Sequence, residues 1–379
     1  MIEVLVIAEP RTTVHAEKDH LVLERGGHVV REVPLSGLAE VLCIGRVEWT
    51  STALWRCLRH EVRVIFMTRD GRYLGRVSGP VTRNGELRLA QYRTVTDPAR
   101  AVEIAKRIVE AKVHNQRSLL MRRQREMKDP DIALALSKMR RILQQLETAK
   151  DIDEVRGLEG AGAQIYFSVF GRLISNPLFT FSGRNRRPPR DPVNAMLSFG
   201  YTVVGALLEG DVEASGLDPA LGCLHACAYG RPSLMLDILE EFRTPVVDRV
   251  VLRLLNRRQL VPTDFGPPEG DSQDEDDESL EVDDGFDPTK IIPALAGNER
   301  QDQGGTDDGD KSLKGAVYLR NPGKKIFISA LLQRLHERVF DMNEQASFEI
   351  RGIMRNQVYR MARAFVDKEC AYHGFKMKE

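Results

Sequence analysis

The sequence predicts an α+β fold, with a small N-terminal β-sheet domain over residues 1–80 and a larger all-α C-terminal domain over 97–379. Short β-rich runs separated by glycine turns predict the first domain. Proline-containing helix starts and apolar residues at helical spacing predict the second, with residues 81–96 as a linker. An acidic stretch at 266–312 interrupts the helical domain. It is expected to be disordered, because its few apolar residues cannot offset the entropy of ordering it.

Two hairpin patterns predict the elements of the N-terminal domain. Residues 20–30 read HLVLERGGHVV, which indicates two short strands around a Gly-Gly turn. Residues 63–77 read RVIFMTRDGRYLGRV, which indicates two more strands around Asp70-Gly71. Between them, TSTALWRCLRHE at 50–61 has the composition of one helix. Strands paired through tight turns in this way indicate a small sheet domain.

Five dipeptides mark predicted helix starts in the C-terminal domain. Each offers a side-chain oxygen that caps free backbone amides, followed by a proline whose φ is already suited to a first helical turn. They are Asp97-Pro98, Asp129-Pro130, Asp191-Pro192, Asp218-Pro219 and Thr244-Pro245. Helical spacing returns after the acidic stretch and continues towards the C-terminus.

The composition indicates a soluble globular protein of two or three domains, since 42% of the 379 residues are hydrophobic and 29% are charged. No stretch approaches the run of about eighteen apolar residues that spans a membrane, so no membrane association is expected. The N-terminus lacks the basic start and apolar run of a signal peptide. The five cysteines are scattered rather than paired in a pattern, which favours a reduced cytoplasmic location.

The formal charge of zero hides two opposed regions. Residues 266–310 hold sixteen acidic and two basic residues, and the rest of the chain holds 53 basic and 39 acidic residues, a charge of +14. A basic body suits a polyanionic partner, because lysine and arginine release counterions when they neutralise phosphates. Many cytoplasmic enzymes are basic as well, so this charge leaves nucleic acid as one of two options.

A histidine and two acids stand within the apolar stretch LHACAYGRPSLMLDILEEF at 224–242. Asp237 and Glu240 are three residues apart and project from one face of a helix, and a tight turn after the short helix that His225 is expected to close can bring the imidazole beside them. Oxygen ligands suit Mg²⁺ or Mn²⁺. An amphipathic helix whose acids face water is the alternative.

Cys223 and Cys227 flank His225 and suggest a zinc site. Their spacing places both thiols on one side of a helix and His225 on the other, which argues against a site using all three and against a Cys–His nucleophile pair. We therefore expect both cysteines to fill the core.

Glu159 lies in RGLEGAGAQIYFSVF, a helical pattern crowded by Gly157, Gly160 and Gly162. Each glycine costs up to about 1 kcal/mol relative to alanine in a helix. Close packing of neighbouring elements around Glu159 would explain them. An ordinary helix N-terminus, where an acid complements the dipole, is the alternative.

Arginines gather in two further places. Arg184, Arg186, Arg187 and Arg190 precede the predicted helix at Pro192, where forked guanidiniums and a helix N-terminus both suit phosphate. Arg122, Arg123, Arg125 and Lys128 form the second cluster. Solvated basic surface is the alternative for both.

Together these segments resemble the CRISPR adaptation integrases and endonucleases, the Cas one family of spacer-acquisition enzymes. The resemblance covers nearly the whole chain except the acidic stretch, with weaker matches in KVHNQ and in the tail from GAVYLRNPGKKIF to YRMARAF. The strong motifs, in the family's order, are RGLEGAGAQIYF, GRNRRPPRDPVNAMLSFGY, GLDPALGCLH and GRPSLMLDILEEFRTPVVDRVVLRLLN.

The resemblance implies a metal-dependent enzyme that inserts short DNA fragments into a CRISPR array, by attack of the fragment's 3′-hydroxyl on repeat phosphodiesters. It implies Glu159, His225 and Glu240 as catalytic metal ligands for Mg²⁺ or Mn²⁺, with Asp237 as a supporting or alternative ligand. It also implies a homodimer that binds double-stranded DNA together with a small ferredoxin-like CRISPR adaptation subunit.

Phosphate contacts are expected from the basic body of such an enzyme. The candidates are Arg184, Arg186, Arg187, Arg249 and Lys324. One departure from many relatives is Ala226, where they carry a polar or acidic residue after the histidine. Two other functions use the same residues: a metal-dependent DNA-repair nuclease without integration, and a metal-free DNA-binding scaffold.

Overall fold

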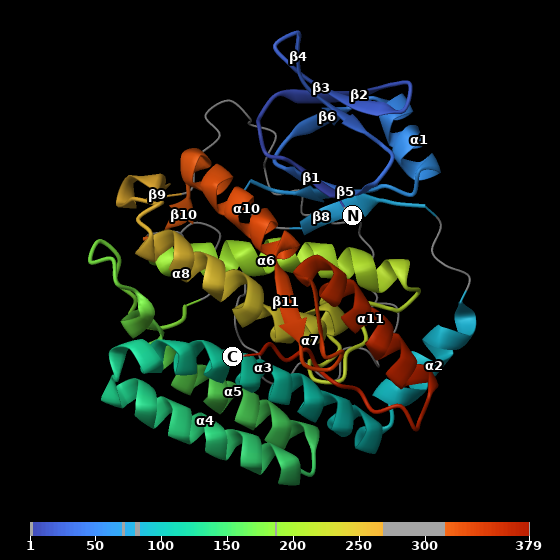
Figure 1. Ribbon diagram of the computed structural model, residues 1–379. Helices are drawn as coiled ribbons and strands as arrows, with labels where there is room; N and C mark the ends of the chain where they lie inside the picture. Colours follow the sequence, from blue (N-terminus) through green and yellow to red (C-terminus); the bar gives the residue numbers. More distant parts are fainter. Residues whose placement is uncertain (1–2, 70–72, 80–83, 186–187, 268–314, 379) are drawn as a thin grey trace.

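The computed structural model describes residues 3–69, 73–79, 84–185, 188–267 and 315–378 (Figure 1). A β-rich N-terminal domain lies at one end of the molecule and a mostly helical domain forms the rest. This confirms the predicted fold class. Within the described residues, no helix combines the length and apolar character needed to cross a membrane.

The N-terminal domain contains two four-stranded sheets that enclose an apolar core. One sheet has the strand order β1-β5-β7-β8 and the other β4-β3-β2-β6. Leu5, Val14, Leu21 and Val64 are among the side chains buried between them. The elements are β1 Glu3–Ile7, β2 Thr12–Glu17, β3 His20–Arg25, β4 His28–Pro34, β5 Leu38–Ile44, β6 Val47–Trp49, α1 Ser51–Arg59, β7 Arg63–Met67 and β8 Tyr73–Val77.

The helical domain has a layer of three long helices, α3, α4 and α5, beside a second group centred on α6 (Figure 1). Its helices are α2 Gly85–Val95, α3 Pro98–Met127, α4 Pro130–Thr148, α5 Ile152–Phe170, α6 Pro192–Ala214, α7 Ser233–Phe242, α8 Arg249–Asn256, α10 Asn321–His336 and α11 Ile350–Val366, with 3₁₀ turns at Gly171–Leu173 and Pro262–Asp264. Two antiparallel ribbons add β9 Phe265–Gly266 with β10 Tyr318–Leu319, and β11 Arg338–Asp341 with β12 Ala346–Glu349.

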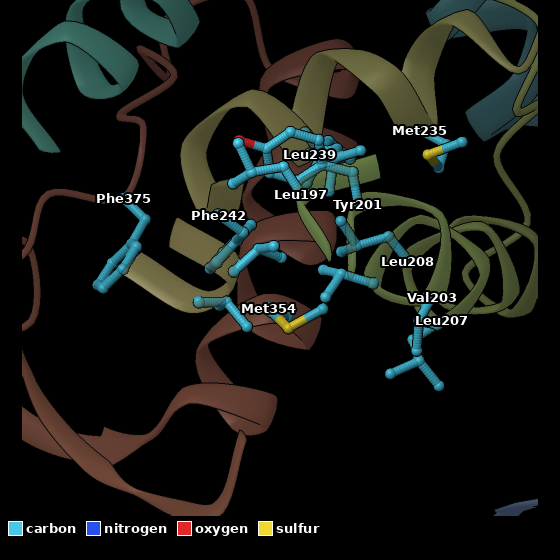
Figure 2. Packing of buried hydrophobic residues seen from close by; sticks show 14 of the residues in the cluster. Leu197, Tyr201, Val203, Leu207, Leu208, Met235, Leu239, Phe242, Met354 and Phe375 are labelled. Atoms are coloured by element: carbon cyan, nitrogen blue, oxygen red, sulfur yellow. The ribbon is translucent and has the colours of Figure 1, made fainter. Parts of the chain in front are cut away.

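Helix α6 is the central helix of this domain, because nearly every side chain along it is buried. Figure 2 shows Leu197 and Leu208 of α6 in one apolar cluster with Leu239 of α7 and Met354 of α11. Phe242 at the end of α7 stacks on Phe375 of the C-terminal segment. This packing holds α7, which carries two of the candidate site residues, rigidly within the core.

Most of the predicted elements are confirmed. The strands around Gly26-Gly27 and around Asp70-Gly71 form hairpins, and Gly26 and Gly27 both have the positive φ that such a turn requires. The aspartates at 97, 129 and 191 each accept backbone amides at the start of a helix, as capping predicts.

Two predicted helix starts are wrong. Asp218-Pro219 leads into turns and not into a helix, because the backbone amides of residues 223–225 bond to the side chain of Asp237 and not to carbonyls one turn back. Thr244-Pro245 lies inside a π-helical segment, Arg243–Asp248, which joins α7 to α8 without a break. The Thr244 hydroxyl donates to the Asp248 carboxylate and caps no helix.

The predicted linker at 81–96 contains helix α2, and the predicted acidic insertion at 266–312 lies almost entirely outside the described residues. The chain on either side of it is brought together in the pairing of β9 with β10.

A buried ion cluster joins the two domains. Glu40 of β5 and Arg63 of β7 meet Asp211 of α6 and Arg351 of α11, and two carboxylates balance two guanidiniums. The Arg351 Nη2 atom lies 2.8 Å from Glu40 Oε2, and Arg63 Nη2 lies 3.0 Å from Asp211 Oδ1. Arg63 also donates to the carbonyl of Gly210. The N-terminal sheet is therefore fixed to the helices by charge pairs with almost no access to water.

Candidate metal centre

Three predicted site residues come together where α3, α5 and α7 meet. Glu159 comes from α5, Glu240 from α7, and His225 from the loop before α7. The His225 Nε2 atom lies 3.9 Å from Glu240 Oε1, too far for a hydrogen bond. Glu159 and Glu240 both reach the same ammonium group, that of Lys112 on α3. Lys112 therefore links the two carboxylates, and the imidazole of His225 lies beside Glu240.

Lys112 occupies the space between the two glutamates. Its Nζ atom lies 2.6 Å from Glu240 Oε2 and also bonds to Glu159 Oε1. Within the described ranges, no group of three or more His, Cys, Asp or Glu side chains is gathered closely enough to hold a metal ion with Lys112 in this position. The two carboxylates are thus held together by a cation that belongs to the chain.

The ionisation of this pair follows from its surroundings. Burial raises the pKa of Glu240, but Arg243, Lys112 and His225 outweigh it, so the pKa lies well below its usual range. Burial lowers the pKa of Lys112, and the charges of Glu240 and Glu159 more than reverse that effect. Glu240 is therefore a carboxylate and Lys112 an ammonium at neutral pH.

Asp237 orients His225 and does not face Lys112. Its fully buried carboxylate accepts the backbone amides of Cys223, Leu224 and His225 at 2.6, 2.9 and 2.9 Å. Its Oδ1 atom also lies 2.7 Å from His225 Nδ1. Since a carboxylate only accepts, Nδ1 carries a proton in this contact, and Nε2 is the ring nitrogen that lies towards Glu240. These contacts favour a supporting role for Asp237.

Gly222 makes this arrangement possible. A Cβ atom at this position would lie 2.7 Å from Asp237 Oδ2 and 2.8 Å from the backbone of Ser233. Only glycine lets the chain pass that close to the aspartate before it turns towards His225. The Ser233 hydroxyl, which donates to the carbonyl of Ala226, holds the other side of the loop.

The π-helical segment positions a second cation. Arg243 lies at its start, with Nε 3.0 Å from Glu240 Oε2 and its guanidinium 4.5 Å from the centre of the Tyr201 ring. The Tyr201 hydroxyl donates to Asp248 at 2.6 Å, and Tyr166 donates to the same carboxylate at 2.8 Å. Asp248 thus fixes the aromatic ring against which Arg243 packs.

Sequence reasoning missed Lys112 and Arg243. Lys112 lies in the weakly matching KVHNQ motif. Its place between the apolar residues Ala111 and Val113 was a sequence signal for a buried cation. Arg243 directly follows the apolar run of α7 and carries no comparable signal.

The glycines around Glu159 have different surroundings. A Cβ atom on Gly162 would lie 3.3 Å from Val113 of α3, so this glycine allows the close approach of α5 and α3. Nothing lies within 4 Å of a Cβ atom on Gly157 or Gly160. Tight packing therefore explains only the third glycine.

The cysteines correct an expectation. No helix spans 223–227, so the helical geometry used to separate the two thiols from His225 does not apply. Cys223 is buried, but Cys227 is exposed and does not fill the core.

The predicted DNA contacts are dispersed. Arg184 donates to Asn194 and Ser198 and lies over the Tyr201 ring, while Arg186 and Arg187 are outside the described residues. Lys324 is in the first turn of α10. Arg249 begins α8 and lines a basic pocket away from Lys112.

Comparisons with known proteins show the family of the chain. The sequence model of the family described as "CRISPR associated protein Cas1" matches residues 5–274. "CRISPR-associated endonuclease Cas1 2" of Rhodospirillum rubrum is 39% identical over 280 residues, which cover 70% of this chain and 79% of the relative. "CRISPR-associated endonuclease Cas1 1" of Moorella thermoacetica is 35% identical over 271 residues, with the same coverage.

Solved structures show the same fold. A Cas1 protein from Thermotoga maritima superposes with a TM-score of 0.72 at 21% identity, covering 96% of this chain and 97% of its own. A structure described as "Casposase bound to integration product" gives 0.73 at 21% identity, covering 97% and 91%. A "Cas6-RT-Cas1--Cas2 complex" gives 0.74 at 22% identity, covering all of this chain and 36% of that one. The family match and the identity to curated relatives together show that this chain belongs to the CRISPR-associated Cas1 family.

Proposed function

We propose that the chain is a metal-dependent DNA integrase and endonuclease that inserts short DNA fragments, as new spacers, into a CRISPR array. The observation that carries this proposal is the convergence of Glu159 and Glu240 on one cationic position, with Nε2 of His225 3.9 Å from Glu240. The curated relatives are CRISPR-associated endonucleases, and a casposase of the same fold is described as bound to an integration product.

The donor set fits a hard divalent cation. Glu159, His225 and Glu240 would hold Mg²⁺ or Mn²⁺, since two carboxylates and an imidazole nitrogen suit such ions. His225 Nε2 and Glu240 Oε1 lie 3.9 Å apart and form no direct hydrogen bond. When bound, the ion would act as a Lewis acid that stabilises charge on the reacting phosphate.

The chain's own residues orient this reaction. Asp237 fixes the His225 ring and holds the proton on Nδ1, while Arg243 and Lys112 add positive charge beside Glu240. Strand transfer forms a bond between the fragment's 3′-oxygen and the repeat phosphorus and breaks the bond to the leaving 3′-oxygen. Preorganised positive charge favours this step, because negative charge increases on the phosphate oxygens in the transition state. Water in place of the 3′-hydroxyl gives hydrolysis.

The proposed assembly is a homodimer that binds double-stranded DNA together with a small ferredoxin-like CRISPR adaptation subunit, in the cytoplasm. One structure of the same fold is a Cas6-RT-Cas1–Cas2 complex, which shows that this neighbour assembles with Cas2. The +14 charge of the chain outside 266–310 supports DNA as a ligand.

A strand-transfer assay separates the candidate functions. Supercoiled plasmid carrying repeat DNA is incubated with a labelled fragment and Mn²⁺ or Mg²⁺, with the wild-type chain and with Glu159→Gln and His225→Ala. Covalently joined products that both variants lose are the expected result. Cleavage without joining would favour a repair nuclease, and metal-independent binding without either reaction would favour a scaffold.

Asp237→Asn is expected to raise the metal concentration needed for half-maximal strand transfer by roughly 10- to 100-fold, as for the loss of other carboxylates that orient a ligand histidine. The amide keeps the size of the side chain but places a donor against either the backbone amides or His225 Nδ1. Asp153→Asn on the surface of α5 is the matched control. An unchanged metal requirement in Asp237→Asn would contradict this role.

A further inference from the structure

A basic pocket of about 370 Å³ lies where α3, α8 and α10 meet, near the turn at Leu173. Six arginines and two glutamates line it. The pocket and the candidate metal centre share helix α3: Lys112 and Arg123 are eleven residues apart on one face of it, which is about 16 Å along the axis. The pocket is thus a separate feature within reach of the same DNA strand.

Half of the pocket's arginines are paired with its own acids. Arg123 Nη1 lies 2.8 Å from Glu126 Oε2, and Arg253 Nη1 lies 2.6 Å from Glu337 Oε1. Arg334 shares the carboxylate of Glu337. These contacts use both glutamates of the pocket.

The other three arginines, Arg122, Arg249 and Arg257, form no ion pair with a carboxylate in the part of the chain that the structure describes. Arg122 and Arg257 are exposed at the rim. Arg249 lies deeper, and its Nε atom is buried without a hydrogen-bond partner among the described residues. Unsatisfied buried donors are rare in folded proteins, because each one loses its hydration without replacement.

The electrostatics of Arg249 are dominated by burial and by other cations. Burial and the nearby guanidiniums of Arg334 and Arg122 together lower its pKa to about 10, and Tyr166 and Glu337 offset only part of that decrease. A guanidinium is normally paired when it is this enclosed. The pocket therefore has an excess of positive charge that a bound anion would compensate.

We propose that this pocket binds one phosphate of the DNA backbone, held by Arg122, Arg249 and Arg257. Guanidinium groups match phosphate oxygens through paired N–H donors, and a tetrahedral phosphate accepts from several directions at once, as three arginines around one hollow require. The choice of DNA rests on the proposed function. Since Lys112 and Arg123 share one face of α3, a strand whose end lies at Glu159 and Glu240 would pass the pocket.

The test measures DNA binding in EDTA, so that it does not depend on metal or on integration. Fluorescence anisotropy with a labelled DNA duplex carrying single-stranded 3′ ends compares the wild type with Arg122→Gln/Arg257→Gln, two exposed positions whose change leaves the core intact. Arg140→Gln/Arg141→Gln, at exposed positions of α4, is the matched control. The pocket variant is expected to reduce the slope of log K against log salt by about 1, the effect of losing one phosphate contact, and the control to leave it unchanged.

A second measurement locates the phosphate. Single methylphosphonates, which remove one backbone charge, are placed along the strand. At one position of the strand, the methylphosphonate is expected to weaken DNA binding by the wild type. The same substitution is expected to cause no further loss of affinity in Arg249→Gln. The proposal is overturned if the pocket variants and the control have the same salt slope, or if no position shows this coupling. If the pocket variants retain DNA binding but lose binding of a protein partner, the pocket binds an acidic protein surface and not DNA. If the wild-type chain performs no strand transfer but the pocket variants show the expected losses in DNA binding, the proposed function is overturned and the phosphate-binding proposal stands.

Discussion

Glu240→Gln is expected to lower the rate of strand transfer by roughly a thousandfold or more. The carboxylate is the point where Lys112, Arg243 and His225 converge, so its charge organises the whole site. The amide keeps the shape but loses the negative charge that a divalent cation requires. Loss of a Lewis acid is worth several kcal/mol of barrier, and each 1.36 kcal/mol is a factor of about ten in rate. Quantified joined product under single-turnover conditions measures the effect.

Two controls separate chemistry from folding in this experiment. Glu147→Gln, an exposed position of α4, is expected to retain wild-type activity. Glu159→Gln removes a carboxylate whose side chain is 23% exposed, compared with 5% for Glu240, so it disturbs the fold less and should still abolish joining. Strand transfer within tenfold of wild type in a folded Glu240→Gln variant would rule out this residue as a ligand.

Arg351→Met is expected to reduce the free energy of unfolding by about 3–5 kcal/mol, the usual cost of removing one partner from a buried ion cluster. Arg351 is 1% exposed and contacts both Asp211 and Glu40, so its loss leaves two carboxylates with Arg63 alone. Arg355→Gln is the control, because Arg355 lies 3.8 Å from Asp211 and its side chain is 32% exposed. Chemical denaturation of both variants measures the difference. Equal midpoints would show that the cluster contributes little.

The same cluster predicts how stability depends on pH. Burial raises the pKa of Asp211, but Arg351 and Arg63 outweigh it, so the folded-state pKa lies below the unfolded value of about 3.9. The folded state therefore binds fewer protons in this range. The stabilisation is fully present above about pH 4 and is lost as the pH falls through the folded-state pKa. Arg351→Met should weaken this acid dependence, which denaturation at pH 3 and pH 7 would show.

Local chemistry allowed much of the fold to be predicted. The Gly26-Gly27 turn and the caps at Asp97, Asp129 and Asp191 depend on residues within one or two turns of each other, so short windows of sequence contain the whole interaction. Asp218-Pro219 has the same local pattern and forms no helix. Its outcome depends on Asp237, which binds the amides of residues 223–225 from 12 to 14 positions further along the chain.

The candidate site was predictable in its acids and not in its cations. Polar residues in apolar or glycine-rich helices are costly, which drew attention to Glu159, His225 and Glu240. The family resemblance then implied that these three residues form one site. Lys112 meets Glu159 and Glu240 only after α3, α5 and α7 pack together. Arg249 was predicted as a phosphate contact, but the sequence did not indicate that it lines a pocket whose charge balance depends on α3 and α10.

Lys112 has a consequence for how the protein depends on its environment. Because Lys112 and Arg243 compensate the charges of Glu159 and Glu240 within the chain, we expect folding to require no imported ion, unlike that of small domains that unfold when their metal is removed. Under the proposed function, an incoming ion would displace an ammonium group that is already in place, which would weaken its apparent affinity. The supply of divalent cations would then control the activity of a protein that is already folded, and folded but inactive molecules would persist until that supply rises.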